Sequence, residues 1–210
     1  MLVALAHGWG FDRSFWTQMI VHLDGFRCIA ADRGYFGTAV EPSVEAACAV
    51  GHSLGGLHLL QALPRGCRGV VIINGFDRFA AMDGRPGVPS RIIDRMLTRF
   101  AQHPLEVVTD FRARCGAPPP PETLNAARLG ADLRLLRYAD ARTASAALAL
   151  PVLLLQGGQD PILPAELREN SFAETGNVRR ETLPDGGHLL PLSHPRWCAE
   201  RIRAFAEGLA

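Results

Sequence analysis

Hydrophobic residues occur along this chain in short uninterrupted runs, and stretches with helical spacing follow most of them. A run of about five apolar residues is typical of a strand that is buried on both faces of a sheet. The runs lie at residues 2–6, 26–31, 46–50, 69–73 and 152–155, with a weaker one at 179–183. Because strands alternate with helices, the pattern predicts an α/β fold with a mostly parallel, doubly wound sheet of about six strands.

Helical periodicity separates these predicted strands. We expect helices at about residues 14–23, 54–63, 164–172 and 195–208, where apolar positions recur every three or four residues. The crossover between the second and third predicted strands is short. It leaves room for at most one or two helical turns, near residues 43–47.

The alternation of strands and helices is interrupted in the middle of the chain. No strand is visible there, and three stretches have helical spacing, at residues 90–102, 104–114 and 122–138. Four consecutive prolines, at 118–121, separate the second of these helices from the third. We therefore predict a helical cap of residues 77–147, which covers the carboxyl edge of a core formed by residues 1–76 and 148–210.

The composition excludes several classes of function. The chain has 210 residues, 48% of them hydrophobic, which is enough for the core of one domain with an insertion. Its formal net charge of +1 gives no overall field for binding nucleic acid or a membrane surface. All 22 basic residues are arginine, so Schiff-base chemistry on a lysine is excluded.

Cysteine usage and the N-terminal segment bear on the compartment. The five cysteines have no C-x-x-C spacing and are odd in number, as expected in a reducing compartment. The first apolar run is too short and too uncharged for a signal peptide, and no apolar run reaches 18 residues. We therefore expect a cytoplasmic protein without a membrane span. We also expect it to act as a monomer.

The third predicted strand leads into Gly51-His52-Ser53-Leu54-Gly55, and a predicted helix follows. A G-x-S-x-G motif between a strand and a helix is typical of a sharp, strained turn that lifts the serine hydroxyl above the sheet. Side chains at the two glycines would collide with the neighbouring strand and helix. We predict that Ser53 is a nucleophile. The alternative is a glycine-rich turn whose serine has no chemical role.

A serine hydroxyl needs a base and an orienting acid to become a nucleophile. Asp160 and His188 each follow a predicted strand, so both are expected at the same sheet edge as Ser53. We predict that His188 accepts the Ser53 proton and later protonates the leaving alkoxide, while Asp160 orients the imidazole. Each of the two also fits a plain turn residue, and Asp32, which ends the second predicted strand, is our second choice for the acid.

The tetrahedral oxyanion that forms when such a serine attacks a carbonyl group also needs two fixed N–H donors. We assign them to the backbone N–H groups of Leu54, directly after the nucleophile, and of Trp9, in the loop after the first strand. For His7, in the same loop, we expect a structural role through hydrogen bonds to the loop backbone. No metal or cofactor is expected, because the sequence lacks the H-x-x-H and H-E-x-x-H motifs and has no G-x-G-x-x-G after a strand.

Together these residues resemble the α/β-hydrolase family over nearly the whole chain. The matching segments are His7-Gly8-Trp9-Gly10, Asp32 with Tyr35-Phe36-Gly37, Gly51 to Gly56, Gly158 with Asp160, and Gly187-His188. Within the family, the chain is most similar to the pimeloyl-acyl-carrier-protein methyl ester esterases of biotin synthesis. That similarity is carried by His7-Gly8-Trp9-Gly10 with Trp16, by residues 79–87, by Phe111 and by the ending Ser193-His194-Pro195.

The resemblance implies a reaction and a substrate site. A methyl ester on a pimeloyl chain held by acyl-carrier protein would be hydrolysed to a free carboxylate, without a cofactor or metal. The acyl chain would lie in a slot lined by Trp9, Leu54, Phe76, Phe111 and Leu189. Plain packing in the core is the alternative role for each of these side chains.

The chain also departs from that family. It begins at the family's third strand, and its crossover before Ser53 is short. Residues 78–148 hold 11 arginines against 7 acidic residues, a net charge of +4 that suits an acidic carrier protein. However, Glu106 and Asp110 stand where the family presents basic residues.

Two alternative functions stay open: a general small-ester or lactone hydrolase outside biotin synthesis, and a ligand receptor without catalytic activity on the same fold.

Overall fold

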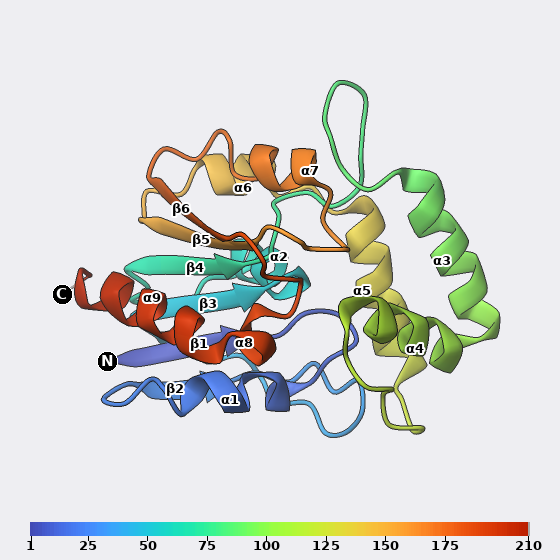
Figure 1. Cartoon of the computed structure of the whole chain (residues 1–210), viewed down its shortest axis with the longest axis horizontal. Coiled ribbons are helices and arrows are strands. Elements are labelled where there is room, and N and C mark those ends of the chain that lie inside the picture. The colour runs from blue at the N-terminus through green and yellow to red at the C-terminus, as the bar shows by residue number, and fades with distance from the viewer. Residues whose placement is uncertain (210) are drawn as a thin grey trace.

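A six-stranded parallel sheet forms the centre of the molecule (Figure 1). The structure, a computed structural model, describes residues 1–209. The strands are β1 (Leu2–Ala6), β2 (Arg27–Ala30), β3 (Cys48–His52), β4 (Gly69–Ile73), β5 (Val152–Gly157) and β6 (Val178–Leu183). Their order is β2-β1-β3-β4-β5-β6, and every neighbouring pair is parallel. The predicted α/β fold with a doubly wound sheet is therefore confirmed.

Helices cover both faces of the sheet, because alternate residues of each buried strand point to opposite sides. On one face, Val71 and Ile73 of β4 pack with side chains such as Met19 and Ile202. On the other face, Ile72 packs with side chains such as Leu57. The helices of the first face are η1 (Arg13–Trp16), α1 (Thr17–Ile20), α8 (Leu190–Ser193) and α9 (Pro195–Glu207); those of the second are α2 (Leu54–Gln61), α6 (Arg142–Ala146) and α7 (Ala165–Asn170).

Three longer helices lie beyond the carboxyl ends of the strands, at the right of Figure 1. They are α3 (Ser90–Gln102), α4 (Pro104–Cys115) and α5 (Ala126–Tyr138), all between β4 and β5. The first two match the predicted ranges closely. The third begins four residues later than predicted, because the Asn125 side chain caps it by accepting a hydrogen bond from the Arg128 N–H. The limits of the cap at 77 and 147 stay predictions.

Two local features differ from the sequence-based expectations. The crossover near residues 43–47, where we expected at most one or two helical turns, is irregular and contains none, and Glu45 forms an isolated bridge with Arg65. The short helices α6 and α8 were not predicted. Each spans only four or five residues, too few for a helical period to be visible in the sequence. No helix within residues 1–209 is long and apolar enough to cross a membrane.

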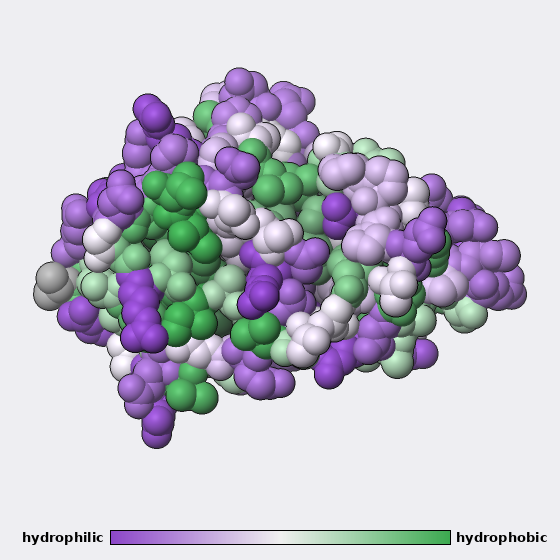
Figure 2. All heavy atoms as spheres, turned by 90° about the horizontal axis from the view of Figure 1, so that it is seen from below, coloured by the Kyte–Doolittle hydropathy of each residue, from purple (hydrophilic) through white to green (hydrophobic). Residues whose placement is uncertain are grey.

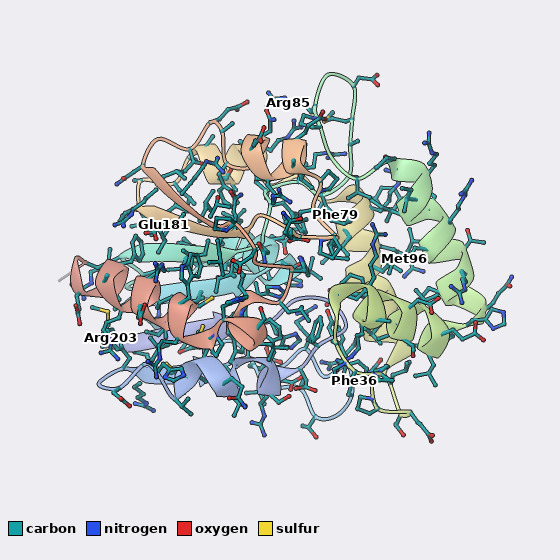
Figure 3. All side chains as sticks on the ribbon, viewed as in Figure 1. Phe36, Phe79, Arg85, Met96, Glu181 and Arg203 are labelled. Carbon is teal, nitrogen blue, oxygen red and sulfur yellow. The ribbon has the colours of Figure 1, made fainter. Side chains whose placement is uncertain are left out.

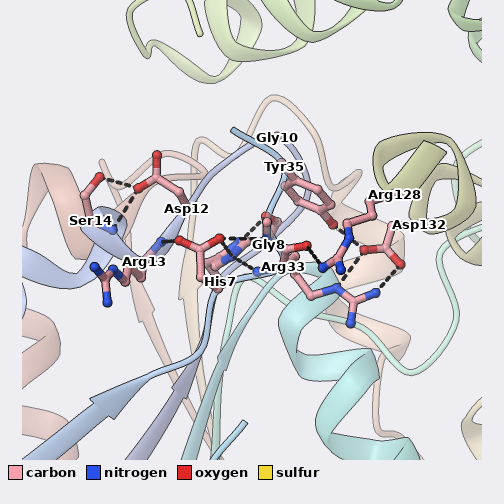
Figure 4. Close-up of polar contacts among 12 residues, drawn as sticks. His7, Gly8, Gly10, Asp12, Arg13, Ser14, Arg33, Tyr35, Arg128 and Asp132 are labelled. Carbon is pink, nitrogen blue, oxygen red and sulfur yellow. Dashed lines mark hydrogen bonds and ion pairs between the residues drawn. The ribbon is translucent and has the colours of Figure 1, made fainter. Parts of the chain in front are cut away.

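A buried carboxylate attaches the cap to the core. Asp132, on α5, receives two hydrogen bonds of 2.8 Å from the Arg33 guanidinium and one of 2.5 Å from the Tyr35 hydroxyl (Figure 4). His58, on α2, lies 3.6 Å from the same carboxylate. Burial by itself raises the pKa of Asp132, but the nearby His58 ring and the hydrogen bonds from Arg33 and Tyr35 outweigh it and lower the pKa to about 2. Asp132 is therefore a charged anchor between α5 and the segment after β2.

Asp132→Asn is expected to remove an acid-sensitive part of the protein's stability. The pKa of an aspartate in an unfolded chain is about 3.9, against about 2 for folded Asp132. The lowered pKa stabilises the fold fully above pH 4, and this stabilisation is lost as the pH falls from about 4 to about 2. Asp132→Asn should lower the free energy of unfolding by on the order of 2 kcal/mol at pH 7 and by almost nothing at about pH 2. Urea unfolding at pH 7, 4 and 2.5 measures this.

Asp83→Asn is a matched control for this experiment, because Asp83 is exposed in the loop before α3. Its free energy of unfolding should stay within about 0.5 kcal/mol of the wild type at each pH. A loss in Asp132→Asn that is equally large at pH 7 and pH 2.5 would contradict the role of the ionised carboxylate.

Candidate active site

Ser53 occupies a sharp turn between the end of β3 and the start of α2. Its backbone has φ of 51° and ψ of −122°, a strained conformation for any residue other than glycine. The Ser53 N–H donates to the Ile73 carbonyl of β4 at 3.0 Å, and the Ser53 carbonyl accepts from the Gly56 N–H at 3.0 Å. These bonds hold the strained turn in place, as the motif predicts.

Both glycines of the motif lie against backbone. A Cβ atom on Gly51 would lie 2.6 Å from the Gly56 backbone in α2, closer than any real contact. A Cβ atom on Gly55 would overlap the Ala6 carbonyl at the end of β1. The predicted reason for the two glycines, collision with the neighbouring helix and strand, is therefore confirmed.

Asp160 and His188 come together in the folded chain. The His188 Nδ1 lies 2.8 Å from Asp160 Oδ2, and both side chains are fully buried. Asp160 Oδ1 accepts hydrogen bonds from the N–H groups of Ile162, at 2.7 Å, and Leu163, at 3.0 Å. The carboxylate is thus fixed by the loop after β5, and it holds the imidazole with a proton on Nδ1.

The other imidazole nitrogen is left without a partner. His188 Nε2 is buried and accepts or donates no hydrogen bond within residues 1–209. Ser53 lies nearby, since the ring of its neighbour His52 is 4.9 Å from the His188 ring and His52 Nε2 bonds to the His188 carbonyl at 2.9 Å. In the described part of the chain no hydrogen bond joins the Ser53 hydroxyl to His188. The structure therefore brings the three residues to one sheet edge and pairs two of them.

The loop after β1 lies next to Ser53. His7 Nδ1 donates to the Gly8 carbonyl at 2.9 Å, and Nε2 accepts from the Arg33 N–H at 3.0 Å (Figure 4). Burial lowers the pKa of His7, so the ring stays neutral and can play both roles. The predicted structural role of His7 is confirmed. Gly8 approaches Ser53 so closely that a Cβ on Gly8 would lie 3.1 Å from the serine Cβ.

Two cap helices hold this loop. The Trp9 indole donates to the Leu129 carbonyl of α5 at 2.8 Å. Arg112 of α4 donates to the Gly10 carbonyl at 2.9 Å. No acceptor for the backbone N–H of Trp9 or of Leu54 is found within residues 1–209. Free, fixed N–H groups are what an oxyanion site requires, and Leu54 also stands at the start of a helix, where the dipole favours negative charge.

A cavity of about 450 Å³ lies between the cap helices and the loop after β5. Most of its lining is apolar and comes from all three helices. The lining includes Phe79, Val88, Ile92, Ile93, Met96, Val107, Phe111, Leu133, Leu136 and Ile162, and it extends to Asp160. Phe79 and Met96 are labelled in Figure 3. A mostly apolar cavity that reaches a buried carboxylate is a suitable site for a small ligand.

Of the predicted slot residues, only Phe111 lines this cavity. Its ring lies 5.1 Å from the Trp9 ring and 6.5 Å from the His188 ring, so it stands between the cavity and the histidine. Trp9 also packs against Phe100, and Phe76 packs against Phe79. Leu54 and Leu189 are buried in the two faces of the core. The helical spacing of Ile92 and Met96 could have indicated the cavity wall that sequence reasoning missed.

Comparison with known proteins places this arrangement in a family. The model of the alpha/beta hydrolase family matches residues 3–201. The chain belongs to the α/β-hydrolase family. It is 25% identical to the pimeloyl-[acyl-carrier protein] methyl ester esterase of Pectobacterium atrosepticum, over 98% of this chain and 94% of that protein. The esterase of the same name from Aromatoleum aromaticum is 28% identical, with 98% of both chains covered.

Solved structures agree with this assignment. The esterase of Exiguobacterium antarcticum superimposes with a TM-score of 0.85 at 17% identity, covering 99% of this chain and 92% of that one. The thermophilic esterase of Thermogutta terrifontis has a TM-score of 0.68 and 25% identity, covering 100% and 90%. The predicted class of enzyme, a carboxylesterase, and the resemblance to the pimeloyl esterases are both confirmed by these relatives.

The cap of this α/β hydrolase is strongly charged outside the cavity. Its end of the molecule is predominantly hydrophilic in the surface view (Figure 2). Arg95, Arg99 and Arg114 border the cavity. Arg99 pairs with Glu106 at 3.1 Å and with Asp110 at 2.5 Å, and Arg114 donates to the Pro161 carbonyl at 2.9 Å. Within residues 1–209, no three His, Cys, Asp or Glu side chains are grouped to hold a metal ion.

Proposed function

We propose that this α/β hydrolase cleaves the methyl ester of a pimeloyl chain carried on acyl-carrier protein, through an acyl-enzyme on Ser53. One observation carries the mechanism: the buried Asp160–His188 pair leaves Nε2 without a partner among residues 1–209, at the sheet edge where Ser53 is held in a strained turn. The relatives named as pimeloyl esterases support the substrate. We place the reaction in the cytoplasm, with the enzyme acting as a monomer.

The mechanism follows from where protons are held. His188 Nε2 takes the Ser53 proton as the hydroxyl attacks the ester carbonyl, and Asp160 stabilises the imidazolium that forms. The N–H groups of Trp9 and Leu54 bind the oxyanion. His188 then protonates the leaving methoxide, which departs as methanol. Water, deprotonated by His188, hydrolyses the acyl-enzyme and releases the free carboxylate.

The cavity supports an acyl substrate. Its apolar lining suits a methylene chain, and its volume of about 450 Å³ fits a ligand of modest size. Phe111, between the cavity and His188, would contact the part of the chain nearest the reacting ester. Arg95 and Arg114 at the border of the cavity carry no ion pair with an acidic side chain in the described chain, so they favour an acidic partner at that end.

A second candidate is a hydrolase of small esters or lactones that uses no carrier. The ion pairs of Arg99 with Glu106 and Asp110 favour it, because they neutralise part of the basic cap surface where a carrier protein would dock. Complementation of a biotin auxotroph that lacks its esterase separates the two. Growth supports the pimeloyl substrate, whereas failure despite good expression and ester hydrolysis in vitro supports the second candidate.

The serine mechanism itself is tested with a fluorophosphonate probe. Such a probe forms a covalent bond only with an activated serine, so peptide mapping should find the label on Ser53. Absence of labelling together with no turnover of p-nitrophenyl esters would favour a ligand receptor on the same fold.

Met96→Trp is expected to shorten the acyl chains that the enzyme accepts. Met96 lines the cavity from α3, and an indole there would fill space that a long chain needs. We expect kcat/KM for p-nitrophenyl octanoate to fall on the order of 10-fold or more, with little change for the acetate, since each methylene in such a pocket is worth about 1–3 kcal/mol. Steady-state kinetics over a series of acyl lengths measures this.

Met82→Trp is the matched control. Met82 is exposed in the loop before α3 and is not part of the cavity lining. Its profile over acyl length should equal that of the wild type. If Met96→Trp lowers activity equally for all chain lengths, the cavity is not the acyl site.

A further inference from the structure

Asn74 is a buried polar residue that the mechanism above does not use. It follows β4 directly, is fully buried, and has a positive φ of 44°. Its side-chain Nδ2 donates to the Gly187 carbonyl at 2.9 Å and to the His188 carbonyl at 2.8 Å. Its Oδ1 accepts from the Gly157 N–H at 2.7 Å. One amide group therefore connects the end of β4 with the end of β5 and with the loop after β6.

The connected segments are those that carry the paired acid and base. Gly157 is the last residue of β5, three residues before Asp160. Gly187 and His188 belong to the loop after β6. The two segments are in close contact, since a Cβ on Gly157 would overlap the Gly187 carbonyl. Asn74 thus fixes the distance between the backbone that presents the carboxylate and the backbone that presents the imidazole.

The His188 carbonyl receives a second donor from the elbow. His52 Nε2 lies 2.9 Å from it, and the His52 ring packs against the Phe15 ring with centroids 4.5 Å apart. Burial lowers the pKa of His52, so the ring is neutral and the proton of this hydrogen bond lies on Nε2. With two donors on one carbonyl, the backbone of His188 is held from both the β4 side and the β3 side.

We propose that Asn74 is a positioning residue, which keeps His188 in register with Asp160 and with the Ser53 turn. The proposal rests on the proposed function of these three residues. A displacement of about 1 Å in a catalytic group lowers the rate on the order of 10²-fold. Because Asn74 bonds to backbone and does not line the cavity, its loss should lower kcat and leave KM nearly unchanged.

Two substitutions separate the hydrogen bonds that the Asn74 amide donates from the one that it accepts. Asn74→Gly removes all three side-chain bonds but tolerates the positive φ, so it adds no backbone strain. Asn74→Asp keeps an oxygen for the Gly157 N–H but places a second oxygen against the carbonyls of Gly187 and His188. If the Asn74 Nδ2 group positions His188, both variants lose kcat. If the Asn74 side chain only supports the end of β5 through Oδ1, Asn74→Asp keeps the wild-type kcat.

The experiment measures kcat and KM for p-nitrophenyl butyrate, the melting temperature, and the proton NMR signal of the His188 Nδ1–H. Ser145→Ala serves as the control, because Ser145 is equally buried and donates to Asp77 at 2.9 Å, away from the site. We expect a 10- to 100-fold loss of kcat in both Asn74 variants, with the Nδ1–H signal shifted or broadened. Ser145→Ala should lose melting temperature but keep kcat and the signal.

The outcomes distinguish this proposal from the function on which it rests. An active wild type together with wild-type kcat and an unchanged Nδ1–H signal in Asn74→Gly overturns the positioning role only. The positioning role is also overturned if Asn74→Gly and Ser145→Ala lose the same melting temperature and Asn74→Gly loses no more kcat than Ser145→Ala. A wild type that hydrolyses esters without any need for Ser53 overturns the proposed mechanism. In that case the NMR signal still reports whether Asn74 holds the histidine.

Discussion

Ser53→Ala is expected to lower kcat for p-nitrophenyl butyrate by on the order of 10⁴-fold or more. The substitution deletes the hydroxyl that we propose attacks the carbonyl, while the N–H groups of Trp9 and Leu54 and the Asp160–His188 pair stay in place. Residual hydrolysis above the rate in water would come from binding and the oxyanion site alone. Steady-state kinetics measures the loss, and circular dichroism should show an unchanged fold.

Ser43→Ala is the matched control for this prediction. Ser43 lies in the irregular crossover before β3, and its hydroxyl donates only to the Glu45 carbonyl. That variant should keep full activity and should be labelled by the fluorophosphonate, whereas Ser53→Ala should not be labelled. Activity or labelling that survives in Ser53→Ala would remove the proposed nucleophile.

The central sheet was predictable because each of its strands has a local signature. The runs at β1, β3, β4 and β5 are apolar on both faces, and only parallel strands covered by helices on both sides are buried in that way. The carboxyl ends of parallel strands meet at one edge, so Ser53, Asp160 and His188 could be placed together from the order of the elements alone.

The cavity between the cap helices was not predictable by the same reasoning. Its walls come from α3, α4 and α5, and the space between them depends on how these helices cross, which no local period encodes. Phe76 and Trp9 illustrate the difference, since both are large and apolar but neither lines the cavity. Phe76 packs against Phe79, and Trp9 packs against Phe100. The hydrogen bonds of the Asn74 side chain were also not predictable, because its partners are backbone groups more than 80 residues away.

Under the proposed function, the hydrogen bonds between the cap and the core would couple substrate binding to the chemistry. Trp9, whose N–H we assign to the oxyanion, is bonded through its indole to α5, and Gly10 is bonded to Arg112 of α4. Arg114, also of α4, bonds to the Pro161 carbonyl next to Asp160. The helices that line the cavity therefore also hold the two loops that carry the proposed oxyanion donor and the proposed acid.

Asp160→Asn is expected to lower kcat on the order of 10⁴-fold. Asn retains an oxygen for the N–H groups of Ile162 and Leu163, so the loop should keep its shape. The amide N–H group of the new asparagine then donates to His188 Nδ1, so the imidazole proton moves to Nε2. A protonated Nε2 cannot accept the Ser53 proton. The fluorophosphonate labelling rate should fall with kcat, while the melting temperature should change little because the side chain keeps its volume.

Two other aspartates serve as controls that decide which acid acts. Asp185→Asn lies in the same loop as His188 but is exposed, so it should keep wild-type activity. Asp32 accepts from the N–H groups of Arg13 and Gly34 and lies 3.9 Å from His7 Nε2, far from the His188 contact with Asp160. Asp32→Asn should therefore change kcat by less than about 10-fold, since it reaches the site only through the loop after β1. If Asp32→Asn abolishes hydrolysis and Asp160→Asn does not, the acid has been assigned to the wrong strand, and the pairing of Asp160 with His188 has a purely structural meaning.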